Sequence, residues 1–273
     1  MEPSIITEVG AIKVKEGKST PISDTVVLEY PFTLHINGEQ YVTLVCSPQH
    51  LEEMVYGLLF SDNIIHGMED VEDLSVVQDK GLARIQLRDH LDDRKKHRGR
   101  RVITSGCGKS TVFYNVEDLV TQRPIRSDVT VTPEVIQEIM KAFDKSSGIY
   151  FSTGGTHSCA LCKEDAILFF ASDIGRHNAL DKCVGYLLKN AIEPDGCYVV
   201  SSGRLSSEMV YKCMRAGIGV VASRSATTKL AIEVADQVGM TLIGFVRGRR
   251  MNVYTHPERI CLEGAVPEGS DEA

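Results

Sequence analysis

The alternation of apolar and polar residues predicts strands in the first half of the chain, together with one helix. Two strand-like runs flank Asn37-Gly38, a dipeptide typical of tight hairpin turns, and two more flank Gly81. Residues 50–62 instead carry apolar side chains at helical spacing. The four predicted strands are 26–36, 40–46, 74–80 and 82–89.

The second half predicts a regular alternation of strands and helices. Thr132 is placed to cap the first helix, with Pro133 in its first turn and Gly148 after its end. Predicted strands are 149–162, 166–173, 196–203, 218–223 and 240–247, and predicted helices are 132–147, 175–190, 205–217 and 227–239. This order predicts an α/β domain with right-handed crossovers and a mixed, largely parallel sheet covered by helices on both faces.

Two domains and a tail are expected from these elements. A smaller α+β domain spans residues 1–130, the α/β domain spans 131–263, and 264–273 form a disordered tail. Ligand sites in such sheets lie beyond the carboxyl ends of the strands, which are residues 201–204, 223–227 and 247–250 in this chain.

Composition limits the possible partners. The net charge is −7 and 42% of the residues are hydrophobic, so nothing in the total charge indicates a nucleic-acid partner. We expect no membrane partner either, because no apolar run approaches a membrane span and the N-terminus does not resemble a signal peptide. We therefore expect a cytoplasmic protein whose eight cysteines are reduced thiols, with Cys183 and Cys213 as ordinary buried residues.

Cys107 is the candidate nucleophile. The segment 104–111 resembles a phosphate loop, but position 103 is Ile where that motif needs glycine, and no dinucleotide fingerprint precedes the α/β half. Glycines on both sides leave the Cys107 sulfur accessible, and the basic run 94–101 favours its thiolate form. The alternatives are an incidental loop cysteine and a solvated basic segment.

Cys159 and Cys162, with His157 before them, could indicate a zinc or redox site. The sequence lacks a second ligand pair, and in a strand these two cysteines point to opposite faces. We therefore favour packed thiols without a structural metal.

A second group of candidates could bind an anion. His177 follows a strand end, where Asp173 and Asp181 fit either a capping and salt-bridge network or a ligand site. The loop Ser202-Gly203-Arg204 offers hydroxyl and backbone donors at a helix start, and the arginines of 247–250 add positive charge. A nucleotide-like anion fits these groups.

The combined motifs SGCG, GGTH, DIGRHNALDK, SSGRLSSEMVYK and GFVRGRRMNVYTHPERI closely resemble the formate dehydrogenase accessory protein family, the FdhD-type sulfur carriers. The resemblance covers nearly the whole chain. It implies a cytidine-deaminase-like α/β domain and a homodimer.

The resemblance also implies a function. The protein would accept sulfur from a cysteine desulfurase and pass it to the molybdenum cofactor, bis-molybdopterin guanine dinucleotide, before insertion into formate dehydrogenase. Cys107 matches the persulfide-bearing cysteine of the family. The cofactor-contacting segment of the family matches Phe245, Val246, Arg247, Gly248, Arg249 and Arg250.

The chain departs from the family pattern at one position, and two alternative functions remain. The family loop is commonly CxxC, whereas Ser110 stands at the second position here, so only a one-cysteine persulfide mechanism is available. A molybdenum-cofactor-binding chaperone would need no thiol, and a zinc deaminase would need metal at His157, Cys159 and Cys162. Whether the ligand is the mature cofactor or a simpler guanine nucleotide stays open.

Overall fold

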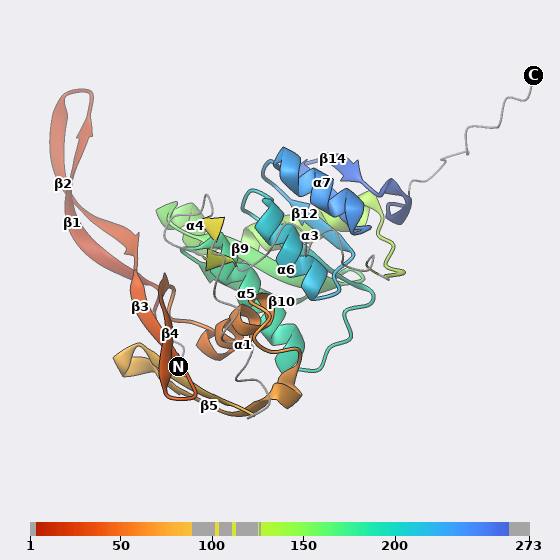
Figure 1. Ribbon diagram of the computed structural model, residues 1–273. Helices are drawn as coiled ribbons and strands as arrows, with labels where there is room; N and C mark the ends of the chain where they lie inside the picture. The colour runs from red at the N-terminus through yellow and green to blue at the C-terminus, as the bar shows by residue number, and fades with distance from the viewer. Residues whose placement is uncertain (1–3, 89–101, 104–110, 113–124, 126, 262–273) are drawn as a thin grey trace, which may run out of the picture.

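The computed structural model describes residues 4–88, 102–103, 111–112, 125 and 127–261 (Figure 1). Its largest sheet has six strands in the order β10-β9-β11-β12-β13-β14, and a four-stranded sheet has the order β4-β3-β6-β5. Two-stranded sheets pair β1 with β2 and β7 with β8. No helix among the described residues has both the length and the apolar character needed to cross a membrane.

The described part of the first half contains the smaller sheets and one α-helix. The strands are β1 (Ile6–Lys15), β2 (Lys18–Val27), β3 (Tyr30–Ile36), β4 (Glu39–Cys46), β5 (Val71–Val77), β6 (Leu82–Leu87), β7 (Val102–Ile103) and β8 (Thr111–Val112). The helix α1 (Leu51–Ser61) follows β4, and short 3-10 turns lie at Met68–Asp70 and Gln78–Lys80. The hairpin around Asn37-Gly38 and the helix are confirmed, and β1 and β2 form an unforeseen ribbon that extends away from the body (Figure 1).

The second half supplies the six-stranded sheet and its helices. Its strands are β9 (His157–Lys163), β10 (Ala166–Asp173), β11 (Cys197–Ser201), β12 (Val220–Ser223), β13 (Thr241–Arg247) and β14 (Arg250–Thr255). Its helices are α3 (Pro133–Ser146), α4 (Gly148–Thr153), α5 (Arg176–Lys189), α6 (Ser207–Arg215) and α7 (Lys229–Gln237), and a 3-10 turn lies at Pro257–Arg259. The predicted cap is confirmed, because Thr132 Oγ1 accepts a hydrogen bond from the Val135 N–H at 3.3 Å.

Helices cover both faces of the six-stranded sheet, as predicted. One face packs on α3, whose Ile136 and Phe143 are fully buried against sheet residues such as Val200. The other face packs on α5, α6 and α7 and continues into the core of the first half. Burial of this apolar surface is the main stabilising term of the fold.

Two sheet predictions are wrong. The sheet is not largely parallel, because only the β11–β12 and β12–β13 pairs are parallel, whereas β9 pairs antiparallel with both β10 and β11 and β14 pairs antiparallel with β13. β9 and β10 are joined by a tight hairpin, which forces antiparallel pairing. Residues 148–153 form the helix α4 rather than a strand, and this helix ends at Gly154, whose φ of +67° suits glycine.

Glycines let α1 contact α5 closely. A Cβ on Gly57 would lie 1.8 Å from the Asp181 carbonyl oxygen, and one on Gly185 would lie 1.7 Å from the Glu53 carbonyl oxygen. The backbones of the two helices therefore touch where the glycines face each other, and one hydrophobic cluster crosses the boundary expected near residue 130. The division into two domains stays a prediction.

Candidate functional site

Three loops meet at one edge of the six-stranded sheet. Because β11, β12 and β13 run parallel, their carboxyl ends at Ser201, Ser223 and Arg247 lie side by side, as the sequence predicts. Backbone hydrogen bonds join the loops: the Leu205 N–H donates to the Ala226 carbonyl at 3.0 Å. The Phe245 N–H likewise donates to the Ser225 carbonyl at 3.0 Å. The edge is therefore one connected surface.

The Ser202-Gly203-Arg204 loop is held by these internal contacts. The Ser202 hydroxyl accepts from the Ser158 N–H at 2.9 Å, and the Ser223 hydroxyl donates to the Gly203 carbonyl at 2.7 Å. A Cβ on Gly203 would lie 3.0 Å from the Arg176 Cβ, so a larger residue would crowd the start of α5. Several polar groups proposed as ligand donors are thus engaged within the protein, whereas the Arg204 side chain is exposed.

A cavity of about 290 Å³ lies beside the last of these strands. Its lining comes from α3 and from the ends of β12 and β13: Gln137, Met140, Lys141, Asp144, Arg224, Val246, Arg247 and Gly248. Val246, Arg247 and Gly248 belong to the segment that the sequence predicts as cofactor-binding. The structure thus places part of that segment in a polar, positively charged hollow.

Several contacts hold the Arg224 side chain in this cavity. Its Nη1 donates to Oδ1 of Asp144 at 2.8 Å, and its guanidinium carbon lies 5.4 Å from the ring centre of Tyr150 and 5.8 Å from that of Phe151. The Arg247 Nε–H donates to the Arg224 carbonyl at 3.0 Å, which places the second arginine next to the first. Two guanidinium groups at one hollow favour an anion.

The remaining predicted residues of this segment lie at the surface. Phe245 has a left-handed φ of +53° and contacts the Arg247 guanidinium, whose carbon lies 5.7 Å from the ring centre. Arg249 and Arg250 are exposed at the turn into β14. Asp144 and Gln137 are not among the predicted site residues, because only the crossing of α3 over the sheet edge brings them to the cavity.

His177 lies away from the cavity, at the start of α5, and is buried. Its Nε2 lies 3.2 Å from Oε2 of Glu208, and this contact lacks hydrogen-bond geometry. Burial, together with the positive charges of Lys212 and Arg176, lowers the pKa of His177 to about 3. At neutral pH the ring is therefore uncharged, with Nδ1 as a buried nitrogen that has no hydrogen-bond partner among the described residues.

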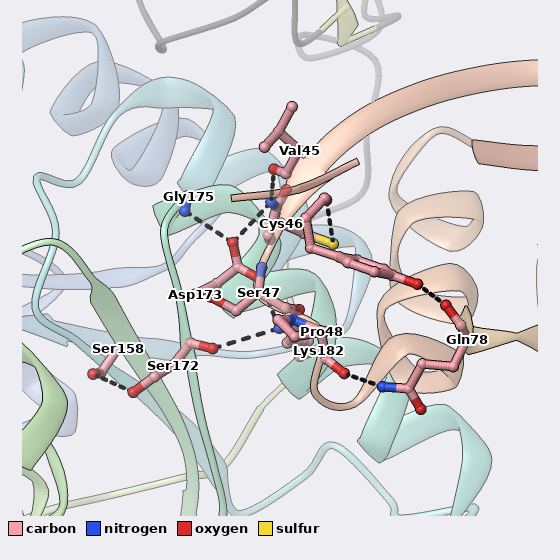
Figure 2. Close-up of polar contacts among 12 residues, drawn as sticks. Val45, Cys46, Ser47, Pro48, Gln78, Ser158, Ser172, Asp173, Gly175 and Lys182 are labelled. Atoms are coloured by element: carbon pink, nitrogen blue, oxygen red, sulfur yellow. Dashed lines mark hydrogen bonds and ion pairs between the residues drawn. The ribbon is translucent and has the colours of Figure 1, made fainter. Parts of the chain in front are cut away.

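Asp173 and Asp181 belong to a buried salt-bridge network, one of the two interpretations that the sequence allows. Oδ2 of Asp173 lies 2.6 Å from Nζ of Lys182, and Oδ2 of Asp181 lies 2.5 Å from Nζ of Lys212. Asp173 also accepts hydrogen bonds from the backbone N–H groups of Ser47 and Gly175, each at 2.9 Å (Figure 2). The Ser61 hydroxyl donates to Oδ1 of Asp181 at 3.0 Å, so both aspartates join the first half of the chain to the second, and both are too buried to be open to a ligand.

The cysteine pair is confirmed as packed thiols on opposite faces of β9. Cys159 belongs to the core on the α5 side and Cys162 to the core on the α3 side, and both are 0% exposed. Burial raises the pKa of both thiols well above the ordinary value. One metal ion cannot bind both sulfurs, so the two cysteines cannot together supply the ligands that the deaminase alternative requires. Cys183 and Cys213 are also buried.

Three predicted features lie outside the described residues. These are Cys107 with its loop, the basic run 94–101, and the tail 264–273, so their interpretation rests on the sequence alone.

The chain is similar to known proteins over nearly its whole length. A protein of Staphylococcus haemolyticus named sulfur carrier protein FdhD is 37% identical over 95% of this chain and 98% of its own length. A Bacillus subtilis protein of the same name is 39% identical over 91% of this chain and 95% of its own. A crystal structure of a putative formate dehydrogenase accessory protein from Desulfotalea psychrophila has a TM-score of 0.79 and 25% identity, and the match covers 94% of this chain and all of that one.

This structural neighbour has a fold similar to the mixed α/β architecture described above. The sequence model of one family, FdhD/NarQ, matches residues 27–261 and so includes the strand-end loops, the cavity and Cys107. The chain belongs to the FdhD/NarQ family.

Proposed function

We propose that this protein is a sulfur carrier required for formate dehydrogenase activity. It takes sulfur from a cysteine desulfurase as a persulfide on Cys107 and delivers it to the molybdenum cofactor, bis-molybdopterin guanine dinucleotide, before that cofactor enters formate dehydrogenase. The observation that carries the proposal is the near full-length similarity to proteins named sulfur carrier protein FdhD.

The buried thiols support Cys107 as the carrier. Seven cysteines lie among the described residues, and six of them are buried, with only Cys261 exposed. A buried thiol with a raised pKa is a poor nucleophile, because the thiolate is the reactive form. Cys46, for example, has its pKa raised to about 12 by burial and by the nearby Asp173 carboxylate. Cys107 and Cys261 are then the remaining candidates, and only Cys107 lies in a glycine-flanked family motif.

The transfer step needs no oxidant. The Cys107 thiolate attacks the terminal sulfur of the desulfurase persulfide, a new S–S bond forms at Cys107, and the desulfurase cysteine leaves as a thiolate. Since Ser110 replaces a second loop cysteine, the persulfide is passed on without an internal disulfide.

The strand-end edge is the proposed cofactor-binding surface. The cavity beside α3 supports this assignment, because Arg224, Arg247 and Lys141 offer positive charge to the phosphates of a dinucleotide. We assign His177, Ser202, Gly203 and Arg204, which lie outside the cavity lining, to the rest of that surface. We further expect a cytoplasmic homodimer.

Mass spectrometry of the intact protein tests the carrier role. After incubation with a cysteine desulfurase and cysteine, we expect a one-sulfur adduct on Cys107 that Cys107→Ala abolishes and Cys261→Ser retains. An adduct that remains in Cys107→Ala would contradict the assignment. A cofactor-binding chaperone without a carrier thiol predicts no adduct at all, and it predicts that Cys107→Ala fully restores formate dehydrogenase activity in cells lacking the protein.

A further inference from the structure

The starts of two helices, α5 and α6, meet on the face of the six-stranded sheet opposite α3. Nε2 of His177, in the first turn of α5, lies 3.2 Å from Oε2 of Glu208, in the first turn of α6. Neither helix has a side-chain cap, because Gly175 before α5 has no side chain and Ser206 before α6 makes no capping hydrogen bond. Helix starts carry partial positive charge and attract negatively charged groups. This junction of α5 and α6 therefore favours an anionic ligand.

His177 brings buried polar atoms without a partner to this junction. Its side chain is 10% exposed, and neither Nδ1 nor Nε2 has a hydrogen-bond partner among the described residues. The hydroxyl oxygens of Thr156 and Ser206, which directly precede β9 and α6, are buried in the same way. In folded proteins nearly all buried polar atoms have a partner, so this group of atoms indicates a place for a ligand.

The surroundings are positively charged, but one carboxylate limits the charge of the ligand. Burial and the positive charges of Arg176 and Arg204 lower the pKa of His157. An anion placed among these groups is stabilised by the same charges. The Glu208 side chain, which is 5% exposed, would however repel a phosphate dianion at the His177 ring. The junction therefore suits a small ligand end with at most one negative charge.

One loop separates this junction from the cavity beside α3. A Cβ on Gly203 would lie 3.0 Å from the Cβ of Arg176, the residue before His177, so the loop packs on the start of α5. The carbonyl of the same glycine accepts a hydrogen bond from the hydroxyl of Ser223, whose chain neighbour Arg224 lines the cavity. A group held at His177 is therefore next to the surface proposed for the cofactor.

The terminal sulfur of a persulfide meets these requirements. It is small, it carries one negative charge as the anion and none as S–H, and it accepts or donates a hydrogen bond accordingly. A neutral imidazole presents one N–H and one lone pair, so its ring can bind either form. Nδ1 is the nitrogen for this contact, because Nε2 of His177 faces Glu208.

We propose that His177 binds the sulfur in transit, with its Nδ1 in a hydrogen bond to the terminal sulfur of the carrier persulfide. This inference rests on the proposed function, in which that persulfide forms on Cys107. The contact keeps the sulfur at the cofactor surface and protects it from other thiols until it is transferred.

NMR of the wild-type full chain with isotope-labelled histidine tests this contact directly. Incubation with a cysteine desulfurase and cysteine loads the sulfur. We expect loading to shift the Nδ1 signal of His177 and to leave the signals of His256, a surface histidine paired with Glu258, unchanged. Sodium hydrosulfide added to Cys107→Ala separates a free sulfide ion from the carried sulfur, and we expect no shift in that sample.

Substitutions of His177 measure what the contact contributes to the lifetime of the persulfide. Glutathione removes the sulfur after loading: its thiolate takes the terminal sulfur as glutathione persulfide, and Cys107 leaves as a thiolate. We expect His177→Leu to shorten the lifetime about fivefold, the effect of losing one hydrogen bond. His177→Asn, whose amide lies near the position of Nδ1, should stay within about twofold of the wild-type protein. His177→Gln, whose amide lies nearer the position of Nε2, should resemble His177→Leu, and His256→Gln is the matched control.

Several results would overturn the inference. They are an unchanged Nδ1 signal after loading, an equal shift with hydrosulfide in Cys107→Ala, and equal lifetimes in the wild-type protein and His177→Leu. An equal loss in the Asn and Gln variants indicates altered packing and also counts against it. The NMR measurement needs no His177 variant, so it decides the question even where a variant fails to fold.

The proposed function has a separate readout. A missing sulfur adduct on wild-type Cys107 contradicts that function. An adduct together with unchanged His177 signals contradicts only the role of His177.

Discussion

Lys182 and Asp173 form an ion pair of 2.6 Å in the core, and both side chains are 0% exposed. Lys182 Nζ also donates to the Ser47 carbonyl at 3.1 Å, while Asp173 Oδ2 accepts from the Ser47 N–H at 2.9 Å (Figure 2). The pair therefore connects the end of β4 to the end of β10, the strand that leads into α5. Its charges are costly to bury and are tolerated because each satisfies the other.

Removing only one of these charges should destabilise the protein strongly. Lys182→Met leaves the Asp173 carboxylate buried without its cation, and we expect the free energy of unfolding to fall by about 3–5 kcal/mol. The double variant Lys182→Met/Asp173→Asn should lose less stability, because it leaves no unpaired charge in the core. Its neutral amide oxygen can still accept a hydrogen bond from the Gly175 N–H. Urea unfolding at pH 7 measures both, and a double variant less stable than Lys182→Met would contradict this account.

Alanine at either glycine of the α1–α5 contact should also destabilise the fold. The added methyl group of Gly57→Ala or Gly185→Ala would meet a backbone carbonyl at less than 2 Å, so the two helices must separate. We expect a loss of about 1–3 kcal/mol in each variant. Gly148→Ala is the control, because a Cβ there has nothing within 4 Å. Thermal unfolding that shows the same change in all three variants would argue against the close contact.

Acid should destabilise the protein partly through His177. Its pKa of about 3 in the folded protein lies below the ordinary value of 6.5, because burial, Lys212, Arg176 and His157 all disfavour the charged ring. Below pH 6.5 this histidine therefore binds a proton in the unfolded chain, whereas in the folded chain it does so only near pH 3. The stability that the neutral ring contributes above pH 6.5 is lost as the pH falls through that window. Within that window His177 lowers the free energy of unfolding by about 1.4 kcal/mol for each pH unit of acidification.

The variant His177→Gln isolates this effect. Between pH 6 and pH 4 its free energy of unfolding should fall less steeply than that of the wild-type protein. Asp62 acts in the opposite direction, since burial raises the pKa of its carboxyl to about 6, but it is present in both proteins and cancels in the comparison. Parallel pH curves for the two proteins would show that His177 does not titrate as described.

Thiol accessibility should follow burial. With iodoacetamide on the native protein, we expect Cys261 to be alkylated rapidly and Cys159, Cys162, Cys183 and Cys213 to react only after unfolding, because their sulfurs are covered. Peptide mass spectrometry after a timed pulse gives the rate at each site. Fast labelling of Cys159 in the folded protein would revive a reactive role for that pair.

Local patterns in the sequence determined most of the secondary structure and much of the chemistry. The hairpin at Asn37-Gly38, the cap at Thr132 and the opposite orientation of Cys159 and Cys162 follow from interactions within a few residues, and the structure confirms them. The strand ends at 201, 223 and 247 could also be placed at one edge, because parallel strands align their carboxyl ends.

Only the tertiary structure decided which distant residues meet. Pairing direction depends on which strands become neighbours, so β9 and β14 turned out antiparallel although the alternation of elements predicted a largely parallel sheet. The cavity has the same origin: Asp144 and Arg224 are 80 positions apart, and no local pattern relates them. Their contact exists because the apolar face of α3 packs on the sheet, which brings the polar end of that helix over the strand ends.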